Sequence, residues 1–223
     1  MTATALVIAT HPDDEVLGCG GVIARHADVG DDVHVLVVTR GIPELFNPEV
    51  IEGTRGELAQ AHAVLGVRSV RFLDFPAPKL DVVPLHEVAD AIGEVIRDLR
   101  PSLVYCPHQG DLHRDHKAVF WATLVAARPV DGHRVSRILC YETLSETNWA
   151  APMPGDAFAP TVFTDITATF RRKLQACRCY RSQLKPFPHS RSVRAVASLA
   201  RLRGATVGLS AAEGFILIRE VIV

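Results

Sequence analysis

The sequence lacks both a strong charge excess and a long apolar run, and these two absences exclude broad classes of protein. Among 223 residues, 24 Lys and Arg nearly balance 25 Asp and Glu, for a formal net charge of −1. Such a balance offers no basic face for nucleic acid or an anionic membrane. No stretch reaches the roughly 18 apolar residues of a membrane span, and the start lacks signal-peptide features. We expect a cytoplasmic protein that neither binds nucleic acid nor inserts into a membrane.

Paired cysteines are also missing. The cysteine count is odd, and no Cys-x-x-Cys pair of the zinc-binding type occurs. We therefore expect reduced cysteines, most of them in the core, in keeping with a cytoplasmic protein. The five are Cys19, Cys106, Cys140, Cys177 and Cys179.

Phosphate-binding glycine loops and aromatic runs are scarce as well. Gly18-Cys-Gly-Gly21 does not have the spacing of a dinucleotide-binding fingerprint, which makes a nucleotide-dependent enzyme a distant alternative. Aromatic residues make up 6% of the chain, and only Trp121 and Trp149 are available for the strongest stacking on sugars. The composition therefore favours a small substrate over a long oligosaccharide.

Short β-branched runs alternate with stretches of helical spacing along the whole chain, which predicts one α/β domain over residues 1–223. Because helices separate the early strands, the sheet should be mostly parallel with right-handed crossovers. A loop is expected at 142–160. The predicted strands are 5–9, 32–39, 69–74, 103–106, 137–141 and 215–219, and the predicted helices are 16–29, 51–65, 83–99, 116–127, 168–180 and 193–203.

A cluster of ionisable residues, His11-Pro-Asp-Asp-Glu15, directly follows the first predicted strand. Open α/β sheets bind ligands at the carboxyl ends of their strands, so this position favours a metal or acid–base site. The alternative is a turn capped by an Asp side chain.

A second cluster weakens that alternative. His113, Asp115 and His116 follow the fourth predicted strand and open a helix. His113 and His116 are three residues apart and share a helix face, while Asp115 can orient an imidazole or cap the helix.

The two clusters should converge, because carboxyl ends of parallel strands meet at one edge of the sheet. Together they offer His11, His116 and one Asp of the Asp13–Asp14 pair, which matches catalytic zinc with an open position. Iron, cobalt or manganese would also accept this donor set. The second Asp is then free to take a proton from water, and His113 can stabilise an oxyanion or protonate a leaving amine.

At these residues the chain resembles the LmbE-like, or PIG-L, family of zinc-dependent de-N-acetylases. The sequences HPDDE and HRDH occur in order, with Thr54-Arg-Gly-Glu57 between them and Ala212-Glu-Gly-Phe215 near the end. The resemblance implies a Rossmann-like three-layer sandwich with a mostly parallel sheet.

The resemblance also implies roles for individual residues. Those implied to bind Zn2+ are His11, Asp14 and His116. Asp13 is implied to be the general base, His113 a general acid or oxyanion stabiliser, and Asp115 a residue that tunes His113. The implied substrate contacts are Arg55 and Glu213.

The implied activity is removal of an N-acetyl group from an N-acetylglucosaminyl-type small molecule or glycoconjugate. The resemblance further implies a homo-oligomer, a trimer or hexamer, and a segment at about 142–215 that lines the substrate cleft or contacts between subunits. Two alternatives stay open: an amidase for a thiol conjugate or other N-acyl metabolite, and a non-catalytic metal-binding module.

Overall fold

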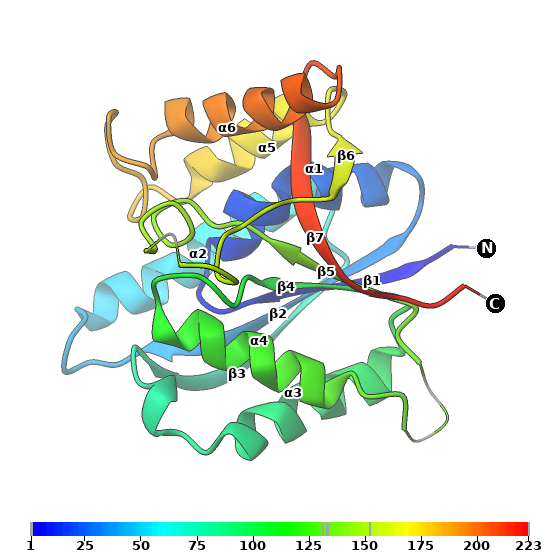
Figure 1. The fold of residues 1–223 in the computed structure, drawn as a ribbon. Helices are drawn as coiled ribbons and strands as arrows, with labels where there is room; N and C mark the ends of the chain where they lie inside the picture. Colours follow the sequence, from blue (N-terminus) through cyan, green and yellow to red (C-terminus); the bar gives the residue numbers. More distant parts are fainter. Residues whose placement is uncertain (1, 131, 133, 152, 223) are drawn as a thin grey trace.

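A computed structural model describes residues 2–130, 132, 134–151 and 153–222 (Figure 1). Within these residues, seven strands form one sheet in the order β3-β2-β1-β4-β5-β7-β6. Strands β1 to β5 pair in parallel, whereas β7 is antiparallel to β5 and β6. The strands are β1 (Thr4–Ala9), β2 (Asp32–Gly41), β3 (Ser69–Ala77), β4 (Leu103–Pro107), β5 (Arg137–Tyr141), β6 (Val162–Asp165) and β7 (Ala212–Glu220).

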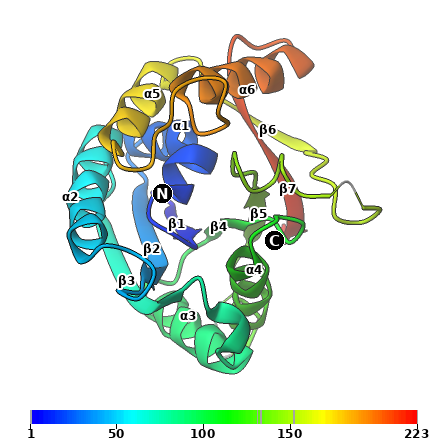
Figure 2. The same cartoon turned by 90° about the vertical axis from the view of Figure 1, so that its left-hand side faces the viewer.

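Helices cover both faces of the sheet, so the predicted three-layer α/β sandwich is confirmed (Figures 1 and 2). One face packs against α1 (Asp14–Asp28), α2 (Pro48–Leu65), α5 (Phe170–Cys179) and α6 (Val193–Thr206). The other face packs against α3 (Leu85–Leu99), α4 (Arg114–Ala126) and the short 3-10 helix η1 (Leu80–Val82). No helix in the described ranges is both long and apolar enough to cross a membrane.

The central strand β1 shows why its sequence is apolar throughout. Val7 and Ala9 join the core under α1, while Leu6 and Ile8 join the core on the opposite face. All four are at most 1% exposed. A strand buried on both faces needs a continuous apolar run rather than alternation.

Element boundaries differ from the predictions where side-chain caps decide them. Helix α2 begins at Pro48 rather than 51, because the Asn47 side chain accepts a hydrogen bond from the Glu49 amide at 2.8 Å. Strand β6 lies in a proline-containing stretch just beyond the predicted loop and was not predicted. Its four half-buried residues pair only with β7, at the edge of the sheet.

Strand β1 lies between β2 and β4, and the direction in which successive strands are added reverses there. This reversal opens a crevice at the carboxyl ends of β1 and β4. The backbone leaves these ends at Thr10 and His108, so both predicted clusters reach the same edge. Close packing behind the crevice holds α1 in place. A Cβ on Gly18 would come within 2.3 Å of the Tyr141 ring, whose hydroxyl donates to the Ile8 carbonyl.

Candidate metal and catalytic site

Three side chains from two different strand ends converge in the crevice. His11 Nδ1 lies 3.3 Å from His116 Nε2, and Asp14 Oδ2 lies 3.2 Å from His116 Nε2 and 3.6 Å from His11 Nδ1. Asp14 and His116 are fully buried, and the His11 side chain is 20% exposed. The predicted grouping of His11, Asp14 and His116 is therefore present in the structure, with one side open to the crevice.

The spacing of these atoms fits a small divalent cation. Tetrahedral bonds of about 2.0–2.2 Å place neighbouring ligand atoms roughly 3.3–3.5 Å apart. The three observed separations cover that range. In addition, the buried Oδ1 of Asp14 has no hydrogen-bond partner among the described residues. An unpartnered buried carboxylate oxygen costs free energy unless a cation or a donor occupies its neighbourhood.

The electrostatics of the cluster also attract positive charge. Burial alone would lower the pKa of His116, but Asp14 and Asp111 raise that pKa well above its usual value. Burial would raise the pKa of Asp14, whereas His116 and His11 hold it well below its usual range. Asp14 is thus an anion, as a metal ligand must be.

Each histidine of the cluster is held from behind by its own carboxylate. Asp111 Oδ2 lies 2.8 Å from His116 Nδ1, and Asp115 Oδ2 lies 3.3 Å from His11 Nε2. Thr147 donates a further hydrogen bond to Asp111 at 2.6 Å. Such partners fix the ring orientation and direct the opposite nitrogen of each ring into the cluster.

The Asp115 carboxylate lies closer to His11 than to His113, the histidine that the resemblance implied. Its Oδ2 is 3.3 Å from His11 Nε2 and 3.9 Å from His113 Nδ1, and its Oδ1 accepts from the Leu80 amide at 3.0 Å. The Asp115 backbone amide donates to His113 Nδ1 at 3.1 Å, so Asp115 contacts both histidines. The cap of α4 is not Asp115, but His113.

Asp13 precedes α1 with φ = 115°, a left-handed conformation that is unfavourable for a residue with a side chain. Its amide donates to Glu15 Oε2 at 3.1 Å, and Glu15 is in turn fixed by the Tyr180 hydroxyl at 2.5 Å and by His62 at 3.1 Å. Strain of this kind costs about 1–3 kcal/mol and persists where surrounding structure enforces it. Here it turns the Asp13 carboxylate away from Asp14 and towards Arg191.

The Asp13 carboxylate is 4% exposed and accepts from Arg191 Nη1 at 3.1 Å. Burial raises the pKa of Asp13 to about 8, with Asp14 and Glu15 adding to the rise and Arg191 opposing it. A carboxyl group with a pKa near 8 is mostly protonated at pH 7, and a cation held by the neighbouring Asp14 would favour its ionised form. Once ionised, it is a stronger base than a carboxylate in water.

His113 lies beside the cluster, with its ring centroid 4.6 Å from that of His11. Its Nδ1 accepts from the Asp115 amide at 3.1 Å and so caps α4. Burial, and secondarily the charge of His11, lower the pKa of His113 to about 4. His113 is therefore neutral at pH 7, and its proton lies on Nε2.

These groups open onto a cavity of about 240 Å³. His11, Asp13 and His113 line it, and Arg55 borders it from α2. The Arg55 guanidinium pairs with Asp74 and lies 4.4 Å from the centre of the Phe72 ring. Arg55 therefore lines the cavity, with its guanidinium engaged by Asp74 and Phe72.

Glu213, the second predicted substrate contact, does not line this cavity, which corrects that prediction. It is 4% exposed and lies beneath α1, where it accepts from the amides of Gly21 and Val22 at 2.8 and 2.7 Å. Lys173 Nζ lies 2.5 Å away and completes a buried ion pair. With its oxygens engaged in this way, Glu213 anchors α1 to β7 instead of meeting substrate.

Four residues of this site have no individual role that the sequence predicts: Asp111, Glu146, Gln183 and Arg191. The last three line the cavity from the predicted 142–215 segment. Arg191 joins them, because its guanidinium donates to Ser145 at 2.7 Å, Gln183 at 3.3 Å and Glu146 at 3.4 Å. Asp111, five residues before His116, could have been suspected as the partner of a metal-binding histidine.

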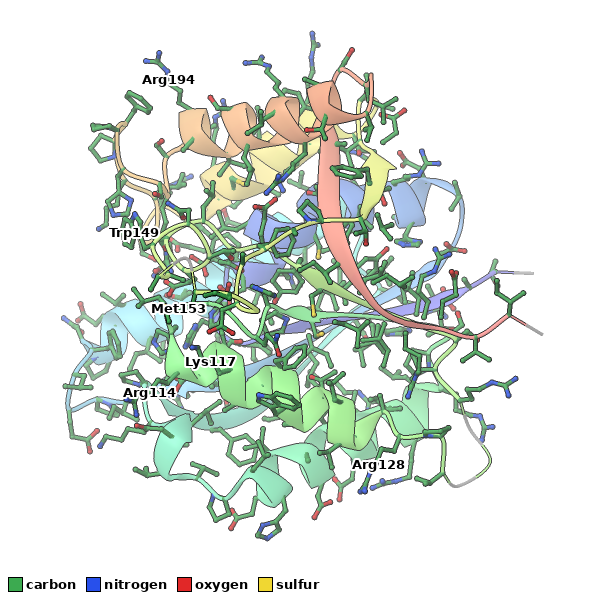
Figure 3. The ribbon with its side chains drawn as sticks, in the orientation of Figure 1. Arg114, Lys117, Arg128, Trp149, Met153 and Arg194 are labelled. Carbon is green, nitrogen blue, oxygen red and sulfur yellow. The ribbon has the colours of Figure 1, made fainter. Side chains whose placement is uncertain are left out.

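The loops that follow the parallel strands gather beside this cavity. Figure 3 shows Arg114, Trp149 and Met153 at this edge of the molecule. Trp149 packs edge-on against His189 at 5.3 Å and is not among the residues that line the cavity.

Comparison with known proteins places this site in a family. The family model described as PIG-L, GlcNAc-PI de-N-acetylase, matches residues 6–127. An uncharacterised deacetylase of Escherichia coli, YaiS, is 32% identical over 79% of this chain and 90% of its own length. A 1D-myo-inositol 2-acetamido-2-deoxy-alpha-D-glucopyranoside deacetylase of Rhodococcus jostii is 31% identical over 82% of each chain.

A solved structure agrees with these sequence matches. A conserved protein of Thermus thermophilus superposes with a TM-score of 0.80 at 29% identity, covering 100% of this chain and 97% of that one. The strand-end clusters, the fold and the relatives lead to one conclusion: the chain belongs to the PIG-L, or LmbE-like, family of de-N-acetylases.

Proposed function

We propose that this chain is a zinc-dependent hydrolase that removes the N-acetyl group from an N-acetylglucosaminyl-type small molecule or glycoconjugate. One observation carries the proposal: a two-histidine, one-carboxylate cluster reaches, through His11, an open cavity that is also lined by Asp13, whose pKa is raised, and by His113, a neutral imidazole. A metal with a purely structural role needs neither of those groups. Relatives that act on acetamido sugars support the choice of substrate class.

His11, Asp14 and His116 would hold the zinc ion. When bound, zinc supplies a lowered pKa for water and polarisation of the acyl carbonyl. Asp111 and Asp115 keep the two imidazoles oriented for this task.

Asp13 accepts the proton that the attacking water loses as its oxygen bonds to the acetyl carbon. Arg191 keeps the carboxylate turned into the cavity while this happens. When the C–N bond breaks, the same carboxyl group returns the proton to the departing nitrogen. The products are acetate and a free amine, and Asp13 ends the cycle as it began.

His113 stabilises the negative charge that develops on the acyl oxygen. Its Nδ1 already accepts from the Asp115 amide, so its Nε2–H is the group left to donate. A neutral donor in a partly buried site binds an oxyanion without first losing a proton. Of the two roles that the resemblance allowed for His113, we therefore favour oxyanion stabiliser over general acid.

The decisive experiment measures free amine released from a panel of N-acetylglucosaminyl compounds. The protein is assayed after zinc loading, after chelation and after restoration of zinc, with the Asp13→Asn variant as a control. We expect release that zinc restores and that the variant lacks. No release from any compound by protein with bound zinc would overturn the N-acetylglucosaminyl assignment and favour the amidase or binding-module alternatives.

Two further proposals concern the protein as a whole: it forms a homo-oligomer, a trimer or hexamer, and it works in the cytoplasm. The resemblance to the family is the ground for the first proposal, and the free cysteines, typical of a reducing compartment, are the ground for the second. Sedimentation of the purified protein tests the first proposal, and fractionation of cells tests the second.

A further inference from the structure

The cavity beside the metal cluster has two chemically different sides. The polar side carries the residues of the proposed mechanism, with Glu146 and Gln183. The opposite side, which we call the apolar wall, comes from the segment after β2, the start of α2 and the end of β3. It consists of Phe46, Val50, Ile51, Phe72, Ala77 and Pro78.

The apolar wall keeps hydrocarbon facing the cavity instead of packing it into the core. Phe46 and Val50 are each 44% exposed, and they lie on the cavity side of the Ile42–Val50 segment. The backbone of Phe46 is held by a hydrogen bond, and its ring packs beside Gly41. Its amide donates to the Ile42 carbonyl at 3.0 Å, and a Cβ on Gly41 would come within 3.1 Å of the ring. The wall is therefore formed before a ligand arrives.

Hydrogen-bonding groups beside the wall are already engaged within the protein. The Thr39 hydroxyl donates to the Thr10 carbonyl, and the Thr54 hydroxyl donates to the Val50 carbonyl, both at 2.7 Å. Arg40 pairs with Glu52 at 2.5 Å. This side of the cavity therefore offers few free donors to the hydroxyls of a second sugar.

We infer that the natural substrate carries an apolar alkyl or aryl group next to its scissile amide, and that this group lies against the apolar wall. The inference rests on the proposed function, since the wall and the groups of the proposed mechanism line one cavity. Apolar surface that a ligand removes from water contributes favourably to binding in proportion to its area. The group belongs either to the amine-bearing part of the substrate, as removal of an acetyl group requires, or to a longer acyl chain, which would replace acetyl in the proposed function.

The test compares substrates in two arms. The first compares benzyl with methyl N-acetylglucosaminide, and the second compares N-octanoyl with N-acetyl groups on the methyl glucosaminide. We expect kcat/KM to rise about tenfold or more in one arm, a change equivalent to burying two or more methylene groups. The arm that responds identifies the source of the apolar group. Ratios near one in both arms overturn the inference, while hydrolysis itself upholds the proposed function.

Two variants test whether the preference for the apolar substrate depends on the apolar wall. In the arm that responds, Phe46→Ser should lower the ratio of the two kcat/KM values at least about threefold, as expected for loss of part of an apolar contact. Leu202→Ser, which alters an apolar residue that is 61% exposed on α6, should leave that ratio unchanged. An unchanged ratio in Phe46→Ser overturns the inference. The inference is also overturned if Phe46→Ser forms a smaller oligomer while the kcat/KM ratio of the two substrates stays the same. The apolar wall would then be a contact between copies of the chain.

If no compound is hydrolysed, the proposed function fails but the wall can still be tested. Binding of benzyl and methyl glucosaminide is then followed by NMR titration of wild type and Phe46→Ser. Tighter binding of the benzyl compound that the variant loses upholds the wall as a ligand site. Equal binding of both compounds overturns it.

Discussion

The guanidinium of Arg191 donates to the carboxylate of Asp13 across 178 residues of sequence, at 3.1 Å. The same guanidinium also contacts Ser145, Gln183 and Glu146, so it cannot rotate freely. Arg191 therefore fixes where the proposed proton acceptor points. Its contacts lie on its own 180–192 segment and on two other loops, one with Asp13 and one with Ser145 and Glu146, so it is sensitive to how these loops pack.

Replacing Arg191 by Met should lower kcat about 10- to 100-fold, as is typical when an orienting partner of a catalytic group is lost. KM should change less, because Arg191 holds Asp13 rather than the metal. Arg191→Lys should recover part of the rate, since it keeps a donor but loses the fork of the guanidinium. Steady-state kinetics and zinc content of each variant provide the measurement.

Arg194→Met is the matched control for this prediction. Arg194 lies three residues further along the chain, and its guanidinium stacks 4.3 Å from the centre of the Phe187 ring. The assignment of Arg191 would be wrong if both variants lost rate to the same degree.

Asp13 and Asp14 should give opposite results when each is replaced by Ala. Asp14→Ala removes a carboxylate 3.2 Å from His116 Nε2, so the variant should lose zinc on dialysis. Asp13→Ala should keep zinc and lose most turnover, on the order of 100-fold or more for loss of a proton acceptor. The zinc content and the rate of amine release, measured for each variant, distinguish the two roles. Equal zinc content in both variants would contradict this division.

Asp111→Asn and Asp115→Asn should each weaken zinc binding about 10- to 100-fold, because each removes the anion behind a metal-binding imidazole. Competition with a chromogenic chelator measures the affinity. Asp98→Asn is a suitable control, since Asp98 is on the surface and pairs only with Arg71 among the described residues. Unaltered affinity in the first two variants would show that the carboxylates do not hold the rings.

Lys173→Met should destabilise the fold by about 3–5 kcal/mol, because it leaves the buried Glu213 carboxylate without its cation. Urea unfolding measures the loss. Lys185→Met, a change at an exposed lysine, should have little effect. Recovery of stability in the double variant Lys173→Met with Glu213→Gln would attribute the loss to the unpaired charge. No recovery would attribute it to packing.

The same pair predicts a dependence on pH. Burial alone would lower the pKa of Lys173, but Glu213 raises it above the ordinary value of 10.5. The ion pair therefore contributes its full stability below pH 10.5, and the contribution is lost as pH rises through the higher folded pKa. The stability gap between wild type and Lys173→Met should narrow in strong alkali. A gap that stays constant to the highest pH at which the protein folds would contradict this account.

Local sequence was enough to predict that His11 and His116 meet beside an Asp of the Asp13–Asp14 pair, and the reason is geometric. His11 follows β1 and His116 follows β4 by fixed short distances, and the carboxyl ends of adjacent parallel strands share one edge. The apolar runs and intervening helices predicted that sheet. By contrast, no local pattern distinguishes Arg191 from other arginines in the last third of the chain, because packing of the 180–192 segment places it.

Glu213 is a residue that the sequence placed wrongly at the substrate. An acidic residue near the end of the chain was expected to face substrate, yet the direction of its side chain depends on the amides of Gly21 and Val22 in α1 and on Lys173. Such partners come from segments 40 and about 190 residues away, so sequence spacing carries no information about them. The start of α4 was misplaced for a related reason, since a histidine rather than an Asp caps it.

The residues on the polar side of the cavity come from two separate stretches of the sequence. Residues 6–127, the stretch matched by the family model, contain His11, Asp13 and His113, whereas Glu146, Gln183 and Arg191 come later. Mutations in the later part can retune the proposed proton acceptor without removing a proposed metal ligand. A directed-evolution library confined to residues 142–191, with Thr147 kept because it donates to Asp111, would therefore explore rate and selectivity while leaving metal loading intact.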